Sequence, residues 1–337
     1  MNRRILLAFP LIFLLSATVY ASSSTSLTIT GTANVVGFAP MNHKFDYVLV
    51  ILMENQGLST VMNGTSAPFM KSLANNYSLA ERYTSLAHPS LPNYLAILSG
   101  SQFSPWTASD CGPSGDTGSC TTGTQPNLID RIESAGLSWK AYAEDYPGQG
   151  TGKLYSSGGC WLADEEPGNF YARHVPMLYF NDIIDNPARC AKIVPASSVV
   201  TSKQETDDIL LKDLSSVSTA SNFMWLTPNG LDDMHDSTVA FGNAYLAKLV
   251  PAILNSTVFR TQKAALFIVF DEGSGSAQYP SDWVYAVWAG PIVKKGYVST
   301  THYSQYSLLA TIEQNWGLHP LTYNDVNAPP MFEFFTT

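Results

Sequence analysis

The chain has few charged residues, few clusters of basic residues and few cysteines, and each of these features excludes some classes of function. Asp, Glu, Lys and Arg make up 13% of its 337 residues, about half of the usual share. Acidic residues outnumber basic ones, 27 to 18, and the only adjacent basic pairs are Arg3-Arg4 and Lys294-Lys295. A nucleic-acid-binding surface needs clustered positive charge. The composition therefore argues against a nucleic-acid partner.

Long hydrophobic runs are also scarce, and the longest lies at the N-terminus, at residues 5–19. It follows Arg3-Arg4 and precedes a small-residue cleavage motif ending at Ala21, which is the order found in secretory signal peptides. A run of about 15 residues is short for a bilayer span. We therefore expect residues 1–21 to be a cleaved signal peptide rather than a membrane anchor, and the protein to be secreted.

The residues after the expected cleavage point divide into a short tail and one large domain. Residues 22–40 are rich in Ser and Thr, which is typical of a tail or short linker. No repeat follows, and no linker after residue 40 is long enough to separate domains. A hydrophobic fraction of 45% supports a sizeable packed core. We expect residues 41–337 to form a single domain.

Only four cysteines are present, and an even number fits an oxidised, extracellular chain. There is no CxxC motif and no spacing typical of a zinc site. Cys111 and Cys120 bracket a loop rich in Gly and Ser, whereas Cys160 and Cys190 enclose a longer segment. Four cysteines allow three pairings. Of these, we expect the local one, Cys111–Cys120 with Cys160–Cys190.

The chain does contain several apolar runs that alternate with helix-forming segments. Runs at residues 45–53, 221–229 and 264–273 are typical of strands buried on both faces. A later strand is expected within residues 283–293. Segments with helical spacing lie between and after these runs, at residues 67–77, 127–135, 239–256 and 306–318. This alternation predicts an α/β fold of three layers, with a mostly parallel central sheet and helices on both faces.

Pairs of oxygen-bearing side chains follow two of the predicted buried strands. Glu54-Asn55 comes directly after residues 45–53, and Asp271-Glu272 ends the run at residues 264–273. An alternative is that these are solvent-exposed loop acids. Strands of a parallel sheet place their carboxyl ends at one edge, where four oxygen donors suit a divalent cation of hard or borderline character. We favour this metal-site prediction; the identity of the metal stays open.

A third acidic group, in the stretch "TPNGLDDMHDS", combines a histidine with three acids. Asp232, Asp233 and Asp236 surround His235. Such a group serves in a metal site or a proton relay, because His titrates near neutral pH. The alternative is an acidic helix N-terminus before Thr238, and both interpretations can hold together.

Ser90 lies between two prolines in "AHPSLPNYLAILSG", directly before a predicted helix. We expect it to cap that helix. The same position suits a nucleophile, because a helix N-terminus presents N–H groups to a phosphate and a neighbouring metal lowers the pKa of a hydroxyl. Asn93, in the first helical turn, either contacts the phosphate or fixes that turn.

Taken together, these stretches resemble a known family. "VILMENQ", "HPSLPNYL", "PNGLDDMHD" and "VFDEG", in this order, are similar to the secreted phosphoesterase family of acid phosphatases and phosphatidylcholine-type phospholipases C, within the alkaline phosphatase superfamily. The resemblance spans roughly residues 44–320. The serine motif is also similar to that of nucleotide pyrophosphatases, where a threonine takes the serine position.

The resemblance implies roles for the residues in these motifs. It implies that Ser90 is the nucleophile and that His235 acts as the catalytic histidine beside the phosphate. His174, in an "RHxP" context, would contact the phosphate, although a lone histidine is more often structural, and Asn93 is a further candidate for binding substrate on its position alone. The implied metal ligands are Glu54, Asn55, Asp271 and Glu272, with Asp233 either supporting His235 or holding a second metal.

The chain departs from the family pattern at one position. The family often has a histidine just before "YSLL", where this chain has Gln305, and His302 lies three positions earlier. The role of that histidine is therefore absent here or has moved to another residue.

The function expected from these observations is an exported, metal-dependent phosphatase that hydrolyses small phosphate monoesters through a phosphoserine, most simply an acid phosphatase. The alternative within the same chemistry is a phospholipase C acting on phospholipid head groups. A non-catalytic binding module is disfavoured, because both acid pairs and Ser90 are present. The oligomeric state is left open.

Overall fold

The computed structural model describes residues 43–113, 120–164, 169–199, 205–274 and 279–336. The predicted signal peptide and Ser/Thr-rich tail lie outside the described residues. Contacts divide the chain into two units at Pro40 and Met41, and the description below concerns the second unit. Within the described ranges, no helix has both the length and the apolar character needed to cross a membrane.

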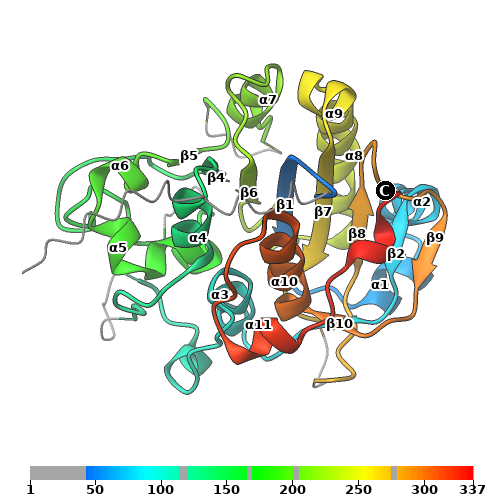
Figure 1. Cartoon of the computed structure of the whole chain (residues 1–337), viewed down its shortest axis with the longest axis horizontal. Helices are drawn as coiled ribbons and strands as arrows, with labels where there is room; N and C mark the ends of the chain where they lie inside the picture. Colours follow the sequence, from blue (N-terminus) through cyan, green and yellow to red (C-terminus); the bar gives the residue numbers. More distant parts are fainter. Residues whose placement is uncertain (1–42, 114–119, 165–168, 200–204, 275–278, 337) are drawn as a thin grey trace, which may run out of the picture. The chain divides into compact units, whose positions relative to one another are not determined.

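An eight-stranded sheet forms the centre of the fold, in the order β5-β4-β6-β1-β7-β8-β2-β9 (Figure 1). All described strand pairs in it are parallel except those made by β8, which runs antiparallel to β7 and β2. Its strands are β1 (Tyr47–Met53), β2 (Ser78–Ala80), β4 (Trp139–Ala143), β5 (Ile193–Pro195), β6 (Phe223–Thr227), β7 (Ala264–Phe270), β8 (Ala286–Ala289) and β9 (Tyr297–Ser299). A separate two-stranded sheet pairs β3 (Tyr83–Thr84) with β10 (Tyr303–Ser304).

Helices cover both faces of the large sheet. The longer helices are α2 (Pro68–Asn76), α3 (Leu91–Ser99), α4 (Leu128–Ser134), α7 (Asp208–Leu214), α8 (Val239–Asn255) and α10 (Gln305–Trp316). α3 packs against α10 and α4, whereas α2 and α7 pack against α8. In Figure 1, α3 and α10 lie in front of the sheet and α8 lies behind it. The predicted α/β fold, with a mostly parallel central sheet between helices, is confirmed.

The remaining helices are short. They are α1 (Leu58–Asn63), α5 (Asn181–Ile184), α6 (Pro187–Cys190), α9 (Thr257–Thr261) and α11 (Tyr323–Asn327), with 3-10 helices η1 (Trp106–Ser109), η2 (Ala172–His174), η3 (Pro176–Tyr179) and η4 (Phe332–Phe334). Several of them belong to the loops that leave the carboxyl ends of the strands.

The two central strands are apolar along their whole length because both of their faces are covered. Every residue of β7 is buried, and in β1 only the first is partly exposed. β1 lies between β6 and β7, so that Val50 is opposite Trp225 on one side and Phe267 on the other. A strand without a polar face can pack only inside a layered structure. These strands therefore fix the position of the loops that follow them.

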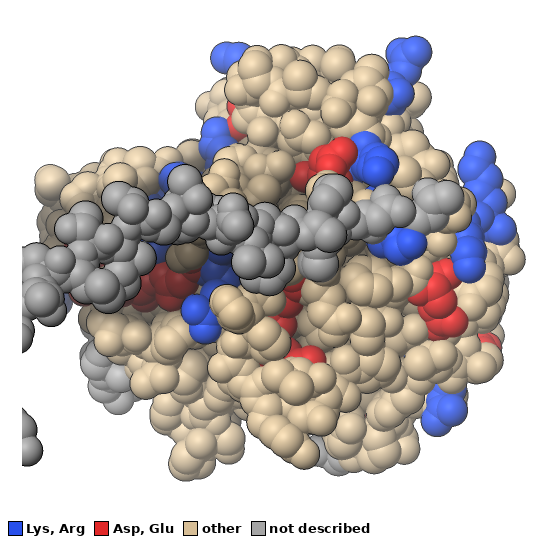
Figure 2. Space-filling model, viewed as in Figure 1, with Lys and Arg blue, Asp and Glu red and all other residues tan. Residues whose placement is uncertain are grey.

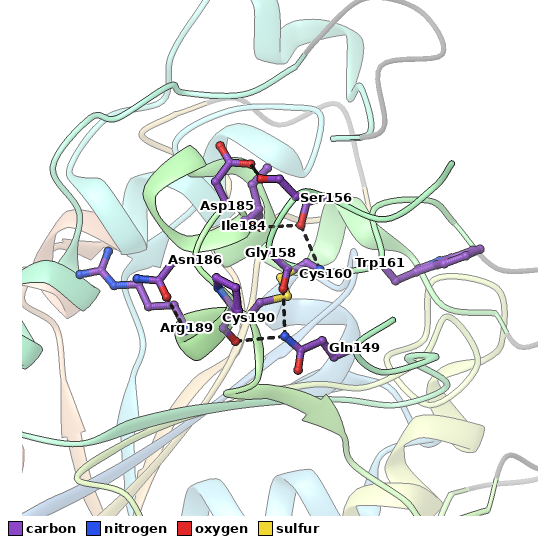
Figure 3. The surroundings of a disulfide bond; sticks show 12 residues. Gln149, Ser156, Gly158, Cys160, Trp161, Ile184, Asp185, Asn186, Arg189 and Cys190 are labelled. Atoms are coloured by element: carbon purple, nitrogen blue, oxygen red, sulfur yellow. Dashed lines mark hydrogen bonds between the residues drawn. A yellow bond between two sulfur atoms is a disulfide. The ribbon is translucent and has the colours of Figure 1, made fainter. Parts of the chain in front are cut away.

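The two disulfides are those predicted from the sequence, Cys111–Cys120 and Cys160–Cys190. Figure 3 shows the second, which joins the loop after β4 to α6, and here the Ser156 hydroxyl donates to the carbonyl oxygen of Ile184. The Cys160 N–H in turn donates to Ser156 Oγ at 2.9 Å. The disulfide and these hydrogen bonds tie together the long connection between β4 and β5.

Candidate active site

Three buried carboxylates lie together beyond the carboxyl ends of the central strands. Glu54 follows β1, Asp271 follows β7, and Asp233 lies in the loop after β6; each is at most 1% exposed. Backbone bonds bring the loops together, because the Glu54 N–H donates to the Asp233 carbonyl at 2.9 Å and the Asp271 N–H to the Met53 carbonyl at 3.0 Å. Adjacent parallel strands thus place acids from distant parts of the chain at one point.

Ser90 contacts this acid group directly. Its hydroxyl donates to Glu54 Oε2 at 3.0 Å, and Ser90 itself is 4% exposed. Ser90 precedes α3, as predicted, but the prediction that its side chain caps the helix is wrong. A capping serine has an extended backbone, whereas Ser90 is already helical (φ −58°, ψ −49°) and makes no side-chain cap bond. This backbone turns the hydroxyl away from the helix and toward Glu54.

Asp110 takes the place at the start of α3 that Ser90 leaves free. Its Oδ1 accepts the Leu91 N–H at 3.0 Å, and its Oδ2 lies 3.1 Å from Arg173 Nε. Arg173 also pairs with Asp164 at 2.6 Å. A backbone N–H at a helix start and a guanidinium are both groups that bind anions. The anion they hold in this structure is the Asp110 carboxylate.

Asn55 links the acids of the two strands. Its backbone N–H lies 3.3 Å from Asp271 Oδ1. With its side-chain nitrogen turned toward the acids, the amide donates to Glu54 Oε2 at 2.8 Å and to Asp271 Oδ1 at 3.1 Å. The opposite orientation presents the amide oxygen, the atom that a metal ion binds. Asn55 can therefore serve either as a donor to the acids or as a ligand beside them.

Crowding of the acids in a buried place favours their protonated forms. Burial, and then the charges of Asp271 and Asp233, raise the pKa of Glu54 well above its usual range. Burial likewise raises the pKa of Asp233 well above its usual range, and that of Asp271 to about 7. Buried like charges repel one another unless a cation or proton compensates them. The site is therefore built to receive positive charge.

His174, in η2, reaches two of the three acids. Its Nε2 lies 3.6 Å from Glu54 Oε1 and its Nδ1 lies 3.4 Å from Asp233 Oδ2, with the side chain 1% exposed. Its ring stacks on that of Tyr94, with centroids 5.4 Å apart, and the Tyr94 hydroxyl donates to Glu54. Burial lowers the pKa of His174 well below its usual value. His174 is therefore best described as a neutral ring facing the acids.

His235 lies at the exposed side of the same group. Its backbone N–H donates to Asp233 Oδ1 at 2.7 Å, and its ring centroid is 5.5 Å from that of His174. Its Nδ1 lies 2.8 Å from Asp236 Oδ1, and the other oxygen of Asp236 accepts the Tyr171 hydroxyl. With 26% of its side chain exposed, His235 is held by Asp236 while its ring stays accessible to solvent.

Glu272, predicted to act with Asp271, turns toward His88 instead. Its Oε1 lies 3.1 Å from His88 Nδ1, and His88 Nε2 lies 2.9 Å from Asp282 Oδ2. Burial, and then the charge of Asp271, raise the pKa of Glu272 to about 9. His88 thus bridges two acids on the flank of the site, two residues before Ser90.

Asn93 holds the loop that leads to Ser90. Its Oδ1 accepts the N–H groups of Leu86 at 2.9 Å and Ala87 at 3.2 Å, and its Nδ2 donates to the Ala87 carbonyl at 2.8 Å. Asn93 is fully buried. Of the two roles considered for it, these contacts favour positioning of the Ser90 loop.

Gln305, which stands where the family often has histidine, lies beside the acid group. It begins α10, is buried, and donates from Nε2 to the Asp271 carbonyl at 2.9 Å. His302 lies elsewhere: its ring is near that of Tyr279, with centroids 5.9 Å apart. Gln305 therefore supports the strand end that carries Asp271, and His302 does not take its place.

The carboxylate oxygens of the acid group are of the kind that binds a divalent cation. Glu54, Asp233 and Asp271 offer buried carboxylates, and the Oδ2 atoms of Asp233 and Asp271 have no hydrogen-bond partner among the described residues. Buried polar atoms without partners are costly. In the described part of the chain, however, no three His, Cys, Asp or Glu side chains are grouped as they stand to hold a metal ion. Binding one therefore requires these side chains to close around it.

Some residues of the site were not singled out from the sequence. Among them are Tyr94, which contacts Glu54, and Asp282, which contacts His88. Tyr94 lies inside the quoted "HPSLPNYL" stretch, one turn after Ser90, and its position was the available signal. No sequence signal pointed to Asp282, because it lies in a loop and its contact with His88 exists only in the folded chain.

On the face seen in Figure 2, Lys and Arg are scattered and do not form one broad patch. Most of the visible surface is uncharged.

Three comparisons place the chain among known proteins. The phosphoesterase family model matches residues 38–319. The chain is 30% identical to the phosphatidylinositol-3-phosphatase of Mycobacterium tuberculosis over 86% of its own length and 83% of that protein. It is 26% identical to a phosphate-repressible acid phosphatase of Penicillium chrysogenum, over 90% of the chain and 66% of the relative. It is equally similar to an acid phosphatase of Aspergillus fumigatus, where it covers 75% of its own length but only 51% of the relative.

The solved structures agree on the fold. A protein in the alkaline phosphatase superfamily from Vibrio parahaemolyticus superposes with a TM-score of 0.57 at 10% identity, over 90% of this chain and 76% of that one. A Bacteroides thetaiotaomicron protein from a locus of glycosaminoglycan metabolism superposes with a TM-score of 0.53 at 12% identity, over 86% of this chain and 81% of that one. These likenesses confirm the predicted superfamily fold. Because the family model matches most of its length, the chain belongs to the phosphoesterase family of phosphoric ester hydrolases.

Proposed function

We propose that the protein is an exported acid phosphatase that hydrolyses phosphate monoesters through a phosphoserine at Ser90. The observation that carries this proposal is the bond from the Ser90 hydroxyl to Glu54 Oε2, inside a buried group of three acids. Its relatives named as acid phosphatases support the reaction class. The predicted signal peptide and the two disulfides support export.

Ser90 is held ready to attack phosphorus. In its ionised form Glu54 takes the Ser90 proton as the Oγ–P bond forms and the ester O–P bond breaks, and it returns the proton to Oγ when water cleaves the phosphoserine. Asn93 fixes the loop before Ser90, so that the hydroxyl stays in line. The result is a phosphoserine and a departing alcohol.

His235 handles the protons of the leaving alcohol and of the attacking water. Its ring is accessible and is oriented by Asp236. As a general acid it protonates the leaving alcohol, and as a general base it then takes a proton from the water that cleaves the phosphoserine. The Arg173 guanidinium and the Leu91 N–H would bind phosphate oxygens once the substrate displaces the Asp110 carboxylate that they hold in this structure.

A divalent cation held by Glu54, Asn55, Asp233 and Asp271, with His174 facing two of these acids, would neutralise the phosphate and lower the pKa of the Ser90 hydroxyl. Glu272, the remaining predicted ligand, pairs with His88 at 3.1 Å and would have to turn away from it to reach the ion.

The test of the nucleophile is the Ser90→Ala variant, assayed with 4-nitrophenyl phosphate and with a bis(4-nitrophenyl) diester. We expect kcat for the monoester to fall by about 10³-fold or more, and denatured wild-type enzyme trapped during turnover to carry one phosphoryl group on the peptide that contains Ser90. Ser99→Ala, at the other end of the same helix, is the matched control and should keep full activity. Normal turnover by Ser90→Ala refutes the proposal.

Removal of metal provides a second test. We expect dialysis against a chelator to abolish hydrolysis of 4-nitrophenyl phosphate, and added divalent cation to restore it. Full activity after chelation, with metal content verified by elemental analysis, would contradict the assignment of the acids as ligands.

A further inference from the structure

A pocket is lined by residues of α1 and of the segment before β8, including Asp282, which pairs with His88. Its volume is about 500 Å³, and its principal lining residues are Leu58, Met62, Leu79, Glu81, Asp282 and Trp283. Leu58 and Met62 belong to α1, which begins shortly after Glu54-Asn55, and Trp283 lies just before β8. Segments from three parts of the chain therefore form its walls.

The pocket neighbours the proposed active site through two of its lining residues, Gly273 and Asp282. Gly273, also in its lining, directly follows the Asp271-Glu272 pair. The Gly273 N–H donates to Asp282 Oδ2 at 2.9 Å, and the same oxygen lies 2.9 Å from His88 Nε2. The Ser85 hydroxyl donates to it as well. Asp282 thus joins the pocket wall to the segment that carries Ser90.

The walls are suited to an apolar group. Trp283 is 42% exposed, an unusual state for so large a hydrophobic residue, and its indole N–H is already bonded to the Pro280 carbonyl at 3.2 Å. Its ring is therefore fixed and offers an apolar surface. Leu58 and Met62 are only partly buried. An exposed apolar concavity beside a reaction centre is a typical ligand site.

The charge of the pocket disfavours a second anion. Its charged lining residues are Glu81 and Asp282, and the described lining contains neither Lys nor Arg. The Arg82 guanidinium lies 5.7 Å from the Trp283 ring centroid but is not a lining group. An additional phosphate or carboxylate in the pocket would face two acids at close range, which is unfavourable.

We propose that this pocket binds the leaving group of the substrate and selects phosphate monoesters of apolar, uncharged alcohols. The inference rests on the proposed phosphatase function and adds the substrate class. The phosphate is held at Ser90, and the apolar alcohol residue lies against Trp283, Met62 and Leu58. Polyanionic esters are excluded by Glu81 and Asp282.

The test compares three monoesters: 2-naphthyl phosphate, glycerol 2-phosphate and fructose 1,6-bisphosphate. We expect Trp283→Ala to lower kcat/KM for 2-naphthyl phosphate about tenfold, mainly through KM, and to change that for glycerol 2-phosphate by less than about twofold. Glu81→Lys should raise kcat/KM for the bisphosphate several-fold. Tyr323→Ala, an exposed aromatic outside the pocket, is the control and should leave all three values unchanged.

Equal losses for both simple esters, or no loss for either, would overturn the pocket assignment while leaving the phosphatase intact. Binding measured by calorimetry with inactive variants tests the pocket independently of the proposed phosphatase activity. We expect Ser90→Ala to bind 2-naphthyl phosphate more tightly than glycerol 2-phosphate, and Ser90→Ala/Trp283→Ala to lose that preference. A wild-type protein that hydrolyses none of the esters refutes the phosphatase proposal, and the calorimetric preference still decides the pocket.

Discussion

At the scale of single residues, the contact between Tyr94 and Glu54 connects the core to the proposed chemistry. The Tyr94 hydroxyl donates to one oxygen of Glu54, and the Ser90 hydroxyl donates to the other. Glu54 is fully buried, so its charge depends on these two donors and on the groups facing it. A hydrogen bond to a charged group contributes about 1.5–3 kcal/mol.

Removing the Tyr94 hydroxyl should therefore weaken catalysis without unfolding the protein. We expect Tyr94→Phe to lower kcat for 4-nitrophenyl phosphate about tenfold, with its melting temperature near that of the wild type. Tyr285→Phe removes a hydroxyl bonded to the Met70 carbonyl and controls for the loss of a buried tyrosine bond. Equal kcat values for the two variants would show that Tyr94 has no part in the reaction.

Sequence reasoning located many residues of the site but not how their side chains point. Glu54 and Asp271 could be found because each follows an apolar strand. Ser90 was placed correctly at a helix start, yet its expected cap bond is absent, since its backbone is already helical there. The direction in which Glu272 turns depends on His88 and Asp282. No local pattern reports a contact that the fold creates between distant loops.

At the scale of secondary structure, α3 carries Ser90 at its start and ends against α11. Gly100 follows α3 with φ 71°, and Thr322 Oγ1 donates to its carbonyl at 3.1 Å. A Cβ at Gly100 would lie 2.6 Å from Thr322 Oγ1 and also clash with Asp325. The end of α3 thus needs a residue without a side chain, both for its backbone angle and for its neighbours.

The prediction is that Gly100→Ala costs about 1–3 kcal/mol of unfolding free energy, because it combines left-handed strain with a steric clash. Gly136→Ala is the matched control, since Gly136 has φ 73° with no atom within 4 Å of the added Cβ. It should cost only about 1 kcal/mol. Urea unfolding of both variants measures the difference, and equal costs would show that the contact with α11 is not tight.

The sequence revealed the long elements better than the short ones. The strands at 45–53 and 264–273 were predictable because an apolar run of seven residues can only be buried on both faces. β2, β5 and β9 have three residues each, too few for any periodic signal. The antiparallel direction of β8 was also not predicted, because direction is set by how the chain crosses the sheet rather than by the strand's own residues.

At the scale of the whole molecule, buried acids outside the proposed site link stability to pH. Asp207, before α7, is 1% exposed, and burial raises its pKa to about 7. Its unfolded-state pKa is about 3.9. A carboxyl whose pKa is raised on folding adds stability that is complete below the unfolded value and is lost as the pH rises through about 7.

We therefore expect the melting temperature to be higher at pH 5 than at pH 8. Asp207→Asn should remove part of this dependence and raise the melting temperature at pH 8 by a few degrees, because the amide carries no buried charge and tolerates the left-handed backbone at this position (φ 50°). Differential scanning calorimetry across pH measures both effects.

Asp208 is a useful comparison because its pKa shifts in the opposite direction. It is exposed, and the hydrogen bond from the Ser198 N–H lowers its pKa, so its ionised form supports the fold above the unfolded value. Asp208→Asn should lower the melting temperature at pH 8 or leave it unchanged. A rise like that of Asp207→Asn would show that burial is not the cause of the effect.

The position of β1 between β6 and β7 determines how much of the chain must be synthesised before the acid group can form. Asn55 and Asp271 meet across neighbouring strands although 216 positions separate them in the chain. A growing polypeptide therefore carries the serine and the first acids long before it carries the strand that completes the group. Until most of its length has been synthesised it lacks the complete acid group, and on the proposed mechanism a fragment ending before Ala264 would be inactive.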